Sequence, residues 1–164
     1  MDGQKESWAS HTAGTENKVV QIVMSLKQIV FTIKGEPKGK GRPRFSKGRV
    51  YTPDKTAQYE SLVALSYRNS AKGYKFTSPV RVTIKAFHKI PKGKAKKVVG
   101  DMLDGRILPT KTPDADNIAK VILDGLNKVA WDDDTQVVDV MVTKRYAEDP
   151  LVAVIIEEID AKRC

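Results

Sequence analysis

Hydrophobic and polar residues alternate along the chain in several short segments, and a period of two is typical of β-strands. The clearest segments are 27–35 and 80–87, in which every second residue is apolar. Two more segments rich in apolar residues lie near the C-terminus, at 138–146 and 151–157, with a turn at 148–150 between them. We therefore predict four strands, the last two joined as a hairpin.

Two other segments repeat apolar residues at the spacing of one helix face. The first begins at Pro53 and Asp54 and ends at Lys72-Gly73. The second begins near Asp116, and its predicted buried stripe consists of Ile118, Val121, Ile122, Leu126 and Val129. The predicted order is strand, helix, strand, helix, strand, strand. This order indicates an α+β domain with a mixed sheet of about four strands packed with two helices.

The remaining segments are polar. Residues 38–49 contain six Lys or Arg residues, with glycines and a proline that favour a loop or a hairpin. Residues 89–112 form a long lysine-rich connection in which only 98–103 could form a short helix, and such a connection is typical of a lid, a binding loop or disorder. We expect residues 1–24 to be a flexible N-terminal extension of a domain that spans 25–164.

The composition limits the possible functions. The chain has 164 residues and a formal net charge of +9, which favours an acidic partner such as the phosphates of a nucleic acid. Its single cysteine, Cys164, cannot form an intrachain disulfide, so we expect a reducing, cytoplasmic compartment. No apolar run reaches the roughly 18 residues of a membrane span. The N-terminus lacks the order of a signal peptide, and we expect no membrane association.

Carboxylates are concentrated near the second helix of this basic chain. Asp114 and Asp116 flank a single residue, so a turn at the helix start would let their carboxylates converge. Lys120 lies one helical turn after Asp116, on the same face. Asp132–Asp134 follow the helix, where a return of the chain would place one of them beside Asp116. Hard oxygen ligands suit Mg²⁺, with Mn²⁺ as a substitute, and such a site favours phosphodiester hydrolysis.

The same residues also have purely structural interpretations. Asp116 can act as a helix N-cap, Asp116 and Lys120 as a surface ion pair, and the Asp triplet as a solvated turn. Spacing alone favours these interpretations over a metal site. No serine or cysteine nucleophile motif offers another catalytic centre. We expect His11, in the extension, and His88, at a strand end, to be solvated.

Four motifs follow one another between Pro113 and Lys144. They are Asp114-Ala115-Asp116-Asn117, then Lys120, then Asp124-Gly125-Leu126-Asn127, and finally Asp133-Asp134-Thr135-Gln136. In this order and spacing they resemble the RusA family of Holliday junction resolvases. The resemblance extends more loosely over residues 27–158. The long connection 89–112 and the N-terminal extension have no identifiable counterpart in the family.

The resemblance implies a magnesium-dependent, homodimeric endodeoxyribonuclease that resolves four-way (Holliday) DNA junctions by paired symmetric nicks in recombination and repair. It assigns catalytic roles to Asp114, Asp116, Lys120 and Asp134. The three aspartates among them would be metal ligands, and Asn117 and Asp133 would support the site. A junction has two-fold character, so a symmetric dimer would place two equivalent sites on opposing strands.

The basic segments are the predicted DNA-binding regions. The candidates are Lys38, Lys40, Arg42, Arg44, Lys47 and Arg49 in the first segment, and Lys92, Lys94, Lys96 and Lys97 in the second. Two other functions fit the sequence: a nuclease for flaps, forks or other branched DNA, and a junction-binding protein without catalytic activity.

Overall fold

The computed structural model describes residues 27–41, 44–46, 49–51 and 54–159, with the backbone alone for 44–46 and 49–51. The predicted extension 1–24 lies outside the described residues. In chain order the elements are β1 (Gln28–Lys34), β2 (Arg44–Ser46), β3 (Arg49–Tyr51), α2 (Asp54–Ala71), β4 (Val80–Lys89), α3 (Lys96–Leu103), α4 (Ala115–Leu126), the 3-10 turn η1 (Asp134–Gln136), β5 (Val137–Ala147) and β6 (Leu151–Glu158).

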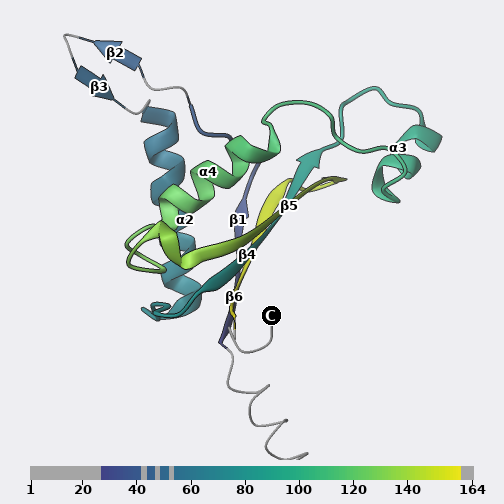
Figure 1. The fold of residues 1–164 in the computed structure, drawn as a ribbon. Helices are drawn as coiled ribbons and strands as arrows, with labels where there is room; N and C mark the ends of the chain where they lie inside the picture. Colours follow the sequence, from purple (N-terminus) through teal and green to yellow (C-terminus); the bar gives the residue numbers. More distant parts are fainter. Residues whose placement is uncertain (1–26, 42–43, 47–48, 52–53, 160–164) are drawn as a thin grey trace, which may run out of the picture.

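Four strands form one mixed sheet in the order β1-β6-β4-β5 (Figure 1). Strand β6 is antiparallel to both β1 and β4, whereas β5 is parallel to β4. This topology confirms the predicted α+β fold with a mixed, four-stranded sheet. The predicted hairpin of the last two strands is wrong, because β6 pairs between β1 and β4. In this central place both edges of β6 are paired, and its burial alternates because the described helices cover only one face of the sheet.

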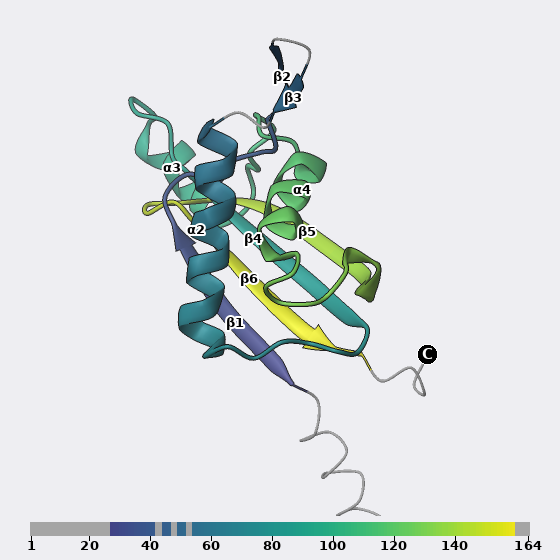
Figure 2. The same cartoon turned by 90° about the vertical axis from the view of Figure 1, so that its left-hand side faces the viewer.

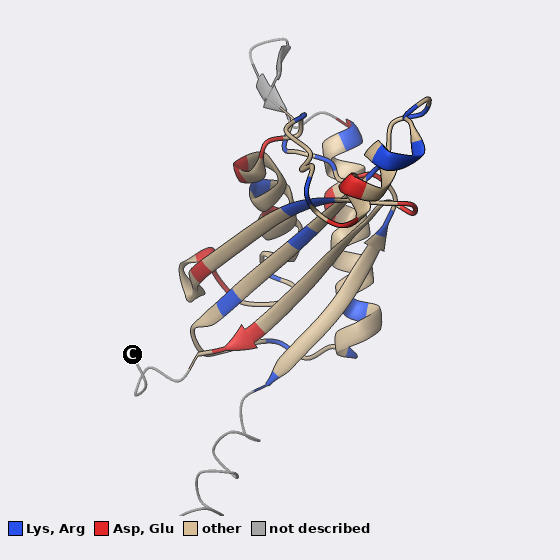
Figure 3. Cartoon of the chain, turned by 90° about the vertical axis from the view of Figure 1, so that its right-hand side faces the viewer, with Lys and Arg blue, Asp and Glu red and all other residues tan. Residues whose placement is uncertain are grey.

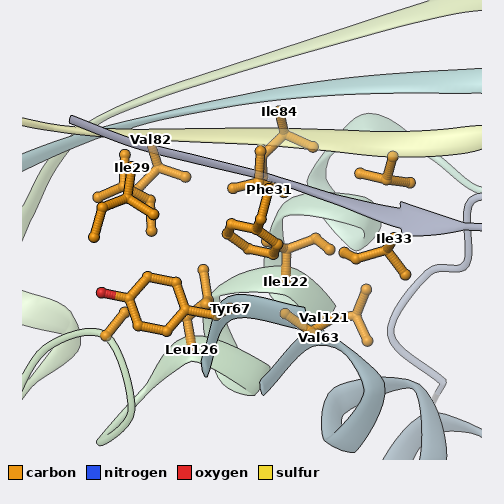
Figure 4. Packing of buried hydrophobic residues seen from close by; sticks show 14 of the residues in the cluster. Ile29, Phe31, Ile33, Val63, Tyr67, Val82, Ile84, Val121, Ile122 and Leu126 are labelled. Carbon is orange, nitrogen blue, oxygen red and sulfur yellow. The ribbon is translucent and has the colours of Figure 1, made fainter. Parts of the chain in front are cut away.

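Helices α2 and α4 lie side by side across one face of the sheet (Figure 2). The core lies between this face and the two helices (Figure 4). Strand β1 buries Ile29, Phe31 and Ile33 and exposes the residues between them, as its alternation predicts. The Phe31 ring meets the Tyr67 ring of α2 edge to face, with 5.7 Å between the centroids. The predicted stripe of α4 is buried from Ile118 to Leu126.

The two polar connections also contain regular structure. Residues 38–49 lead into the hairpin of β2 and β3, and the short helix predicted within 89–112 is present as α3. Helix α3 is a third helix, which packs beside β5 and leaves α2 and α4 as the cover of the sheet. No helix in the described part of the chain is long and apolar enough to cross a membrane.

The other face of the sheet is not covered by any helix of the described residues (Figure 3). Strand β5 forms one edge of the sheet, because within the described residues only β4 pairs with it. Its side chains include exposed apolar groups: Val138 is 60% exposed and Met141 is 55% exposed. An edge strand of 11 residues with exposed apolar side chains is suited to pairing with another strand.

A glycine permits the close contact between α2 and α4. A Cβ atom placed on Gly125 would lie 2.9 Å from the Glu60 carbonyl oxygen and 2.9 Å from Val63 Cβ. Both neighbours belong to α2, and one is backbone, so a side chain at position 125 would push the two helices apart. Gly125 is buried, and the residues beside it on α4 fill the core.

We expect Gly125→Ala to lower the free energy of unfolding by about 1–3 kcal/mol, because the added methyl group overpacks the helix contact. Urea unfolding of the purified protein measures the change. The matched control is Gly100→Ala in α3, where the new Cβ would meet no atom of the described residues within 4 Å. That substitution should be neutral or stabilise the protein by about 0.5–1 kcal/mol. Equal effects of the two substitutions would contradict the packing role of Gly125.

Candidate active site

The start of α4 carries three of the four predicted catalytic residues. Asp114 is the N-cap of the helix, and within the described part of the chain its side chain makes no capping hydrogen bond. Asp116 lies in the first turn, and Lys120 Nζ donates a hydrogen bond to Asp116 Oδ2 over 3.1 Å. All three side chains are exposed. The carboxylates of Asp114 and Asp116 are therefore accessible to a ligand from solvent.

Lys120 also affects the charge of Asp116. The hydrogen bond from Lys120 is the largest cause that lowers the pKa of Asp116, and backbone N–H groups of the first helical turn add to it. Asp116 is therefore a carboxylate at neutral pH. Because both partners are exposed, we expect this ion pair to contribute little to folding stability. The pair leaves a carboxylate and an ammonium group together at the surface.

Two distant parts of the chain hold the start of α4 in place. The Lys144 side chain of β5 donates a hydrogen bond to the Lys111 carbonyl, three residues before Asp114. From the other side, the Lys40 N–H donates to the Asn117 carbonyl over 2.9 Å. The Thr112–Pro113 peptide bond between these contacts is cis. The family resemblance implies that Asn117 supports the site, and the structure shows that its backbone carbonyl takes part in one of these contacts.

The Asp132–Asp134 segment forms an ordered turn beyond the C-terminal end of α4. Asp133 caps η1, and its Oδ1 accepts a hydrogen bond from the Thr135 N–H over 3.0 Å. Gln136 Oε1 accepts from the backbone N–H groups of Asp132 and Asp133. Asp134 Oδ1 accepts from the indole Nε1 of Trp131 over 3.0 Å. Trp131 is fully buried, so it anchors Asp134 to the core.

A single chain does not bring Asp134 to Asp114 and Asp116. Helix α4 has 12 residues, and a helix of this length is about 18 Å long. Trp131 forms a backbone bridge with Phe76, which keeps the turn at the far end of α4. Among the described residues, no group of three or more Asp, Glu, His or Cys side chains is arranged to hold a metal ion. The expected return of the Asp triplet to Asp116 is therefore not found within one chain.

Basic segments project on either side of the start of α4. The β2-β3 hairpin and helix α3 extend from the same end of the molecule, with the N-terminus of α4 between them (Figure 1). The side chains of Lys92, Lys94, Lys96 and Lys97 are exposed. The side chains of Arg42, Arg44, Lys47 and Arg49 lie outside the described residues. Lys38 lies over the Tyr59 ring, and Lys40 pairs with two carboxylates.

Comparison with known proteins identifies the family. A model of endodeoxyribonuclease RusA matches residues 34–157. The chain belongs to the RusA endodeoxyribonuclease family. It is also similar to a protein of Bacillus subtilis (strain 168) described as uncharacterized protein YqaN, with 39% identity over 142 residues, or 81% of this chain and 98% of that protein. The RusA match includes the whole of α4 and the Asp132–Asp134 turn.

Several residues of the RusA-like pattern have structural roles in this chain. Asp124 pairs with Lys40, Gly125 admits α2, and Leu126 is buried in the core. Gln136 Nε2 donates hydrogen bonds to the carbonyl oxygens of Phe76 and Ser78, which ties η1 to the segment before β4. Thus only part of the RusA-like pattern is available for chemistry, chiefly the exposed groups at the start of α4.

His88 was expected to be solvated, and this expectation is wrong. It is 1% exposed, because the alternation of β4 turns it toward the helices with Ala86. Its Nδ1 lies 3.7 Å from Glu36 Oε2, and its Nε2 has no hydrogen-bond partner among the described residues. Burial lowers the pKa of His88, and the positive charges of Lys144 and Lys111 lower it further, while Glu36 acts in the opposite direction.

We expect His88 to make folding stability fall in mild acid. The unfolded chain takes up a proton near the ordinary histidine pKa of 6.5, whereas the folded protein takes it up only at a lower pH. Stability is therefore lost as the pH falls from about 6.5 toward the lowered pKa, by about 1.4 kcal/mol for each unit of lowering.

Urea unfolding between pH 7.5 and 5 measures this loss, and His88→Phe should reduce it. NMR offers an independent check, because the chain has only two histidines. A His88 ring that titrates above 6.5 in the folded protein would contradict the prediction.

Proposed function

We propose that this RusA-family protein is a magnesium-dependent endodeoxyribonuclease that resolves four-way DNA junctions by paired nicks. The main support is the arrangement at the start of α4, where Asp114, Asp116 and Lys120 are exposed together between two basic projections. Membership of the RusA family supports the reaction class, and the exposed groups at the start of α4 support that position as the site of the reaction. The net charge of +9 is consistent with a DNA substrate.

The donor groups at this site fit magnesium. Mg²⁺ is typically bound by one or two carboxylates together with substrate phosphates and water, and Asp114 and Asp116 provide two accessible carboxylates. When bound, the metal supplies Lewis-acid activation of the phosphodiester and of a water molecule. Mn²⁺ has the same preference for oxygen ligands and would be a substitute. Asp116, with its lowered pKa, is available as a ligand at neutral pH.

We infer that Lys120 acts on the substrate as well as on Asp116. Its ammonium group is exposed and lies beside the carboxylate at the site. A phosphodiester gains negative charge in the transition state of hydrolysis, and a fixed cation nearby stabilises that charge. We infer that Lys120 serves this role or orients the attacking water. In either role its contribution is greater in the transition state than in the DNA complex.

The two basic projections, the β2-β3 hairpin and the segment that includes α3, would bind the DNA backbone in the arms of the junction. The exposed Lys92, Lys94, Lys96 and Lys97 lie on and before α3, and the β2-β3 hairpin contains arginines on the other side of the site. Contacts of this kind with phosphates are independent of sequence and weaken as salt rises. They position the DNA backbone, while the carboxylates between them act on a phosphodiester.

We further infer that a symmetric dimer completes the site with Asp134. Strand β5 begins at Val137, three residues after Asp134, and near its other end Lys144 contacts Lys111, close to Asp114. If the exposed edges of two β5 strands pair in antiparallel fashion, the start of each lies beside the end of the other. Asp134 of the partner subunit would then approach Asp114 and Asp116. The apolar side chains on β5 favour such a contact.

We expect Asp116→Asn to abolish nicking of a synthetic four-way junction in Mg²⁺ while junction binding is retained. The nicking rate should fall by more than roughly 100-fold. A loss of about 100-fold is the upper limit expected when the mutated residue only supports a metal ligand. The experiment compares junction, fork, flap and linear duplex, with nicks mapped at nucleotide resolution and EDTA as the blank. Asp54→Asn, in the first turn of α2, is the matched control. Loss of binding together with nicking would show that Asp116 is structural.

Mixing two inactive variants tests whether Asp134 acts across a dimer. Asp116→Asn and Asp134→Asn should each be inactive alone. After they are unfolded and refolded together, half of the dimers are mixed, and each mixed dimer has one intact site. About a quarter of wild-type nicking should return, as single nicks in place of symmetric pairs. If no activity returns, Asp134 does not complete the site from the partner subunit.

A further inference from the structure

Lys40 joins the two helices that cover the sheet. Its Nζ lies 2.5 Å from Glu60 Oε1 on α2 and 2.5 Å from Asp124 Oδ2 on α4. The side chains of Lys40 and Glu60 are only 26% and 22% exposed. Burial by itself would lower the pKa of Lys40, but the hydrogen bonds to Asp124 and Glu60 outweigh it, so the pKa is raised. The Lys40 side chain is therefore charged at neutral pH.

The backbone beside Lys40 is fastened to the same two helices. The Lys40 N–H donates to the Asn117 carbonyl over 2.9 Å, and the Gly41 N–H donates to Thr56 Oγ1 over 3.2 Å. At position 39 only glycine fits, because a Cβ there would lie 2.8 Å from Pro113 Cβ and 3.1 Å from Asn117 Cβ. We call Gly39–Gly41 the clasp. It holds α4 beside α2 at the end where Asp116 lies.

The clasp touches α4 at two places along one face. The backbone of Lys40 holds Asn117 in the first turn, and its side chain holds Asp124 seven residues later. Seven residues are about two turns of helix, so the two contacts resist both rotation and sliding of α4. Asp116 directly precedes Asn117. Any shift of the first turn therefore moves the Asp116 carboxylate with it.

The charges around Lys40 make it a poor contact for DNA. One ammonium group lies between two carboxylates, so the three side chains together carry a charge of about −1 at neutral pH. A DNA phosphate that reached Lys40 would have to displace Glu60 and Asp124 and would leave both carboxylates unpaired. By contrast, Lys92 is exposed, and it forms no ion pair with the described residues.

We propose, building on the nuclease function proposed above, that Lys40 is a positioning residue for the carboxylates at the start of α4 and does not contact DNA. Its side chain and backbone together set the place of α4 relative to α2. Catalysis by positioned groups is sensitive to small displacements, and an error of about 1 Å can reduce a rate by about 100-fold. Loss of the clasp should therefore reduce cleavage more than it reduces binding.

The test replaces Lys40 with methionine, which keeps the aliphatic stem and removes the charge. Lys40→Met should lower the nicking rate of bound junction at least roughly tenfold, while the slope of log K against log salt for binding stays at the wild-type value. Lys92→Met should instead reduce the magnitude of that slope by about 0.9, as expected when one phosphate contact is lost. A fall in slope for Lys40→Met equal to that for Lys92→Met would overturn the proposal.

A second control separates positioning from general stability. Ile29→Val removes one buried methyl group from β1, at the opposite edge of the sheet from β5, and should lower stability without a change in nicking rate. Urea unfolding of Lys40→Met, Asp124→Asn and the double variant forms a double-mutant cycle. We expect clear coupling between Lys40 and Asp124. Additive effects would overturn the proposal even if the enzyme is active.

The same measurements distinguish a failure of this proposal from a failure of the proposed function. If the wild-type protein nicks no branched DNA with Mg²⁺, the nuclease function fails. The coupling cycle and the salt slopes do not depend on nicking, so they still decide whether Lys40 fastens α4 or contacts DNA. If nicking is present and Lys40→Met nicks bound junction at the wild-type rate, the positioning role is wrong and the nuclease function stands.

Discussion

The close packing of α2 and α4 over one face of the sheet determines where each candidate functional group lies. The apolar stripe of α4 faces the core, and Ile118 and Ile122 on that stripe are fully buried. Asp116 and Lys120 each precede one of these residues by two positions, which is about 200° around a helix. Burial of the isoleucines therefore turns the aspartate and the lysine outward. The hydrophobic core and the exposed site are two consequences of one helix orientation.

Two glycines of this chain serve that packing. Gly125 lets α4 approach α2, and Gly39 lets the segment after β1 approach Pro113 and Asn117. Charged residues beside each glycine then pair with one another, since Lys40 binds Asp124. Two motifs that lie far apart in the chain, Gly39-Lys40 and Asp124-Gly125, are thus parts of one contact. The packing of the two helices therefore accounts for these residue types without any role in DNA chemistry.

Much of the fold could be predicted because alternation and helical spacing are local properties. Strands β1 and β4 and the stripe of α4 were predicted from residue order alone. Strand pairing is not local, and nothing in the order of residues 138–157 says that β6 lies beside β1. His88 has an inward place in the alternation of β4, but its polar side chain favoured a solvated interpretation. Lys40 looked like a free cation because its partners, Glu60 and Asp124, are distant in sequence.

The position of Asp134 could not be predicted from spacing, because a carboxylate after a helix can lie at either end of it. Here the rigid length of α4 separates Asp134 from Asp116, and Trp131 holds it there. If Asp134 of a partner subunit completes the site, as proposed, a solitary molecule lacks one of the ligands. At high dilution, where most chains are monomers, the cleavage rate would then rise with the square of the enzyme concentration. A newly synthesised chain would not cleave DNA until it had dimerised.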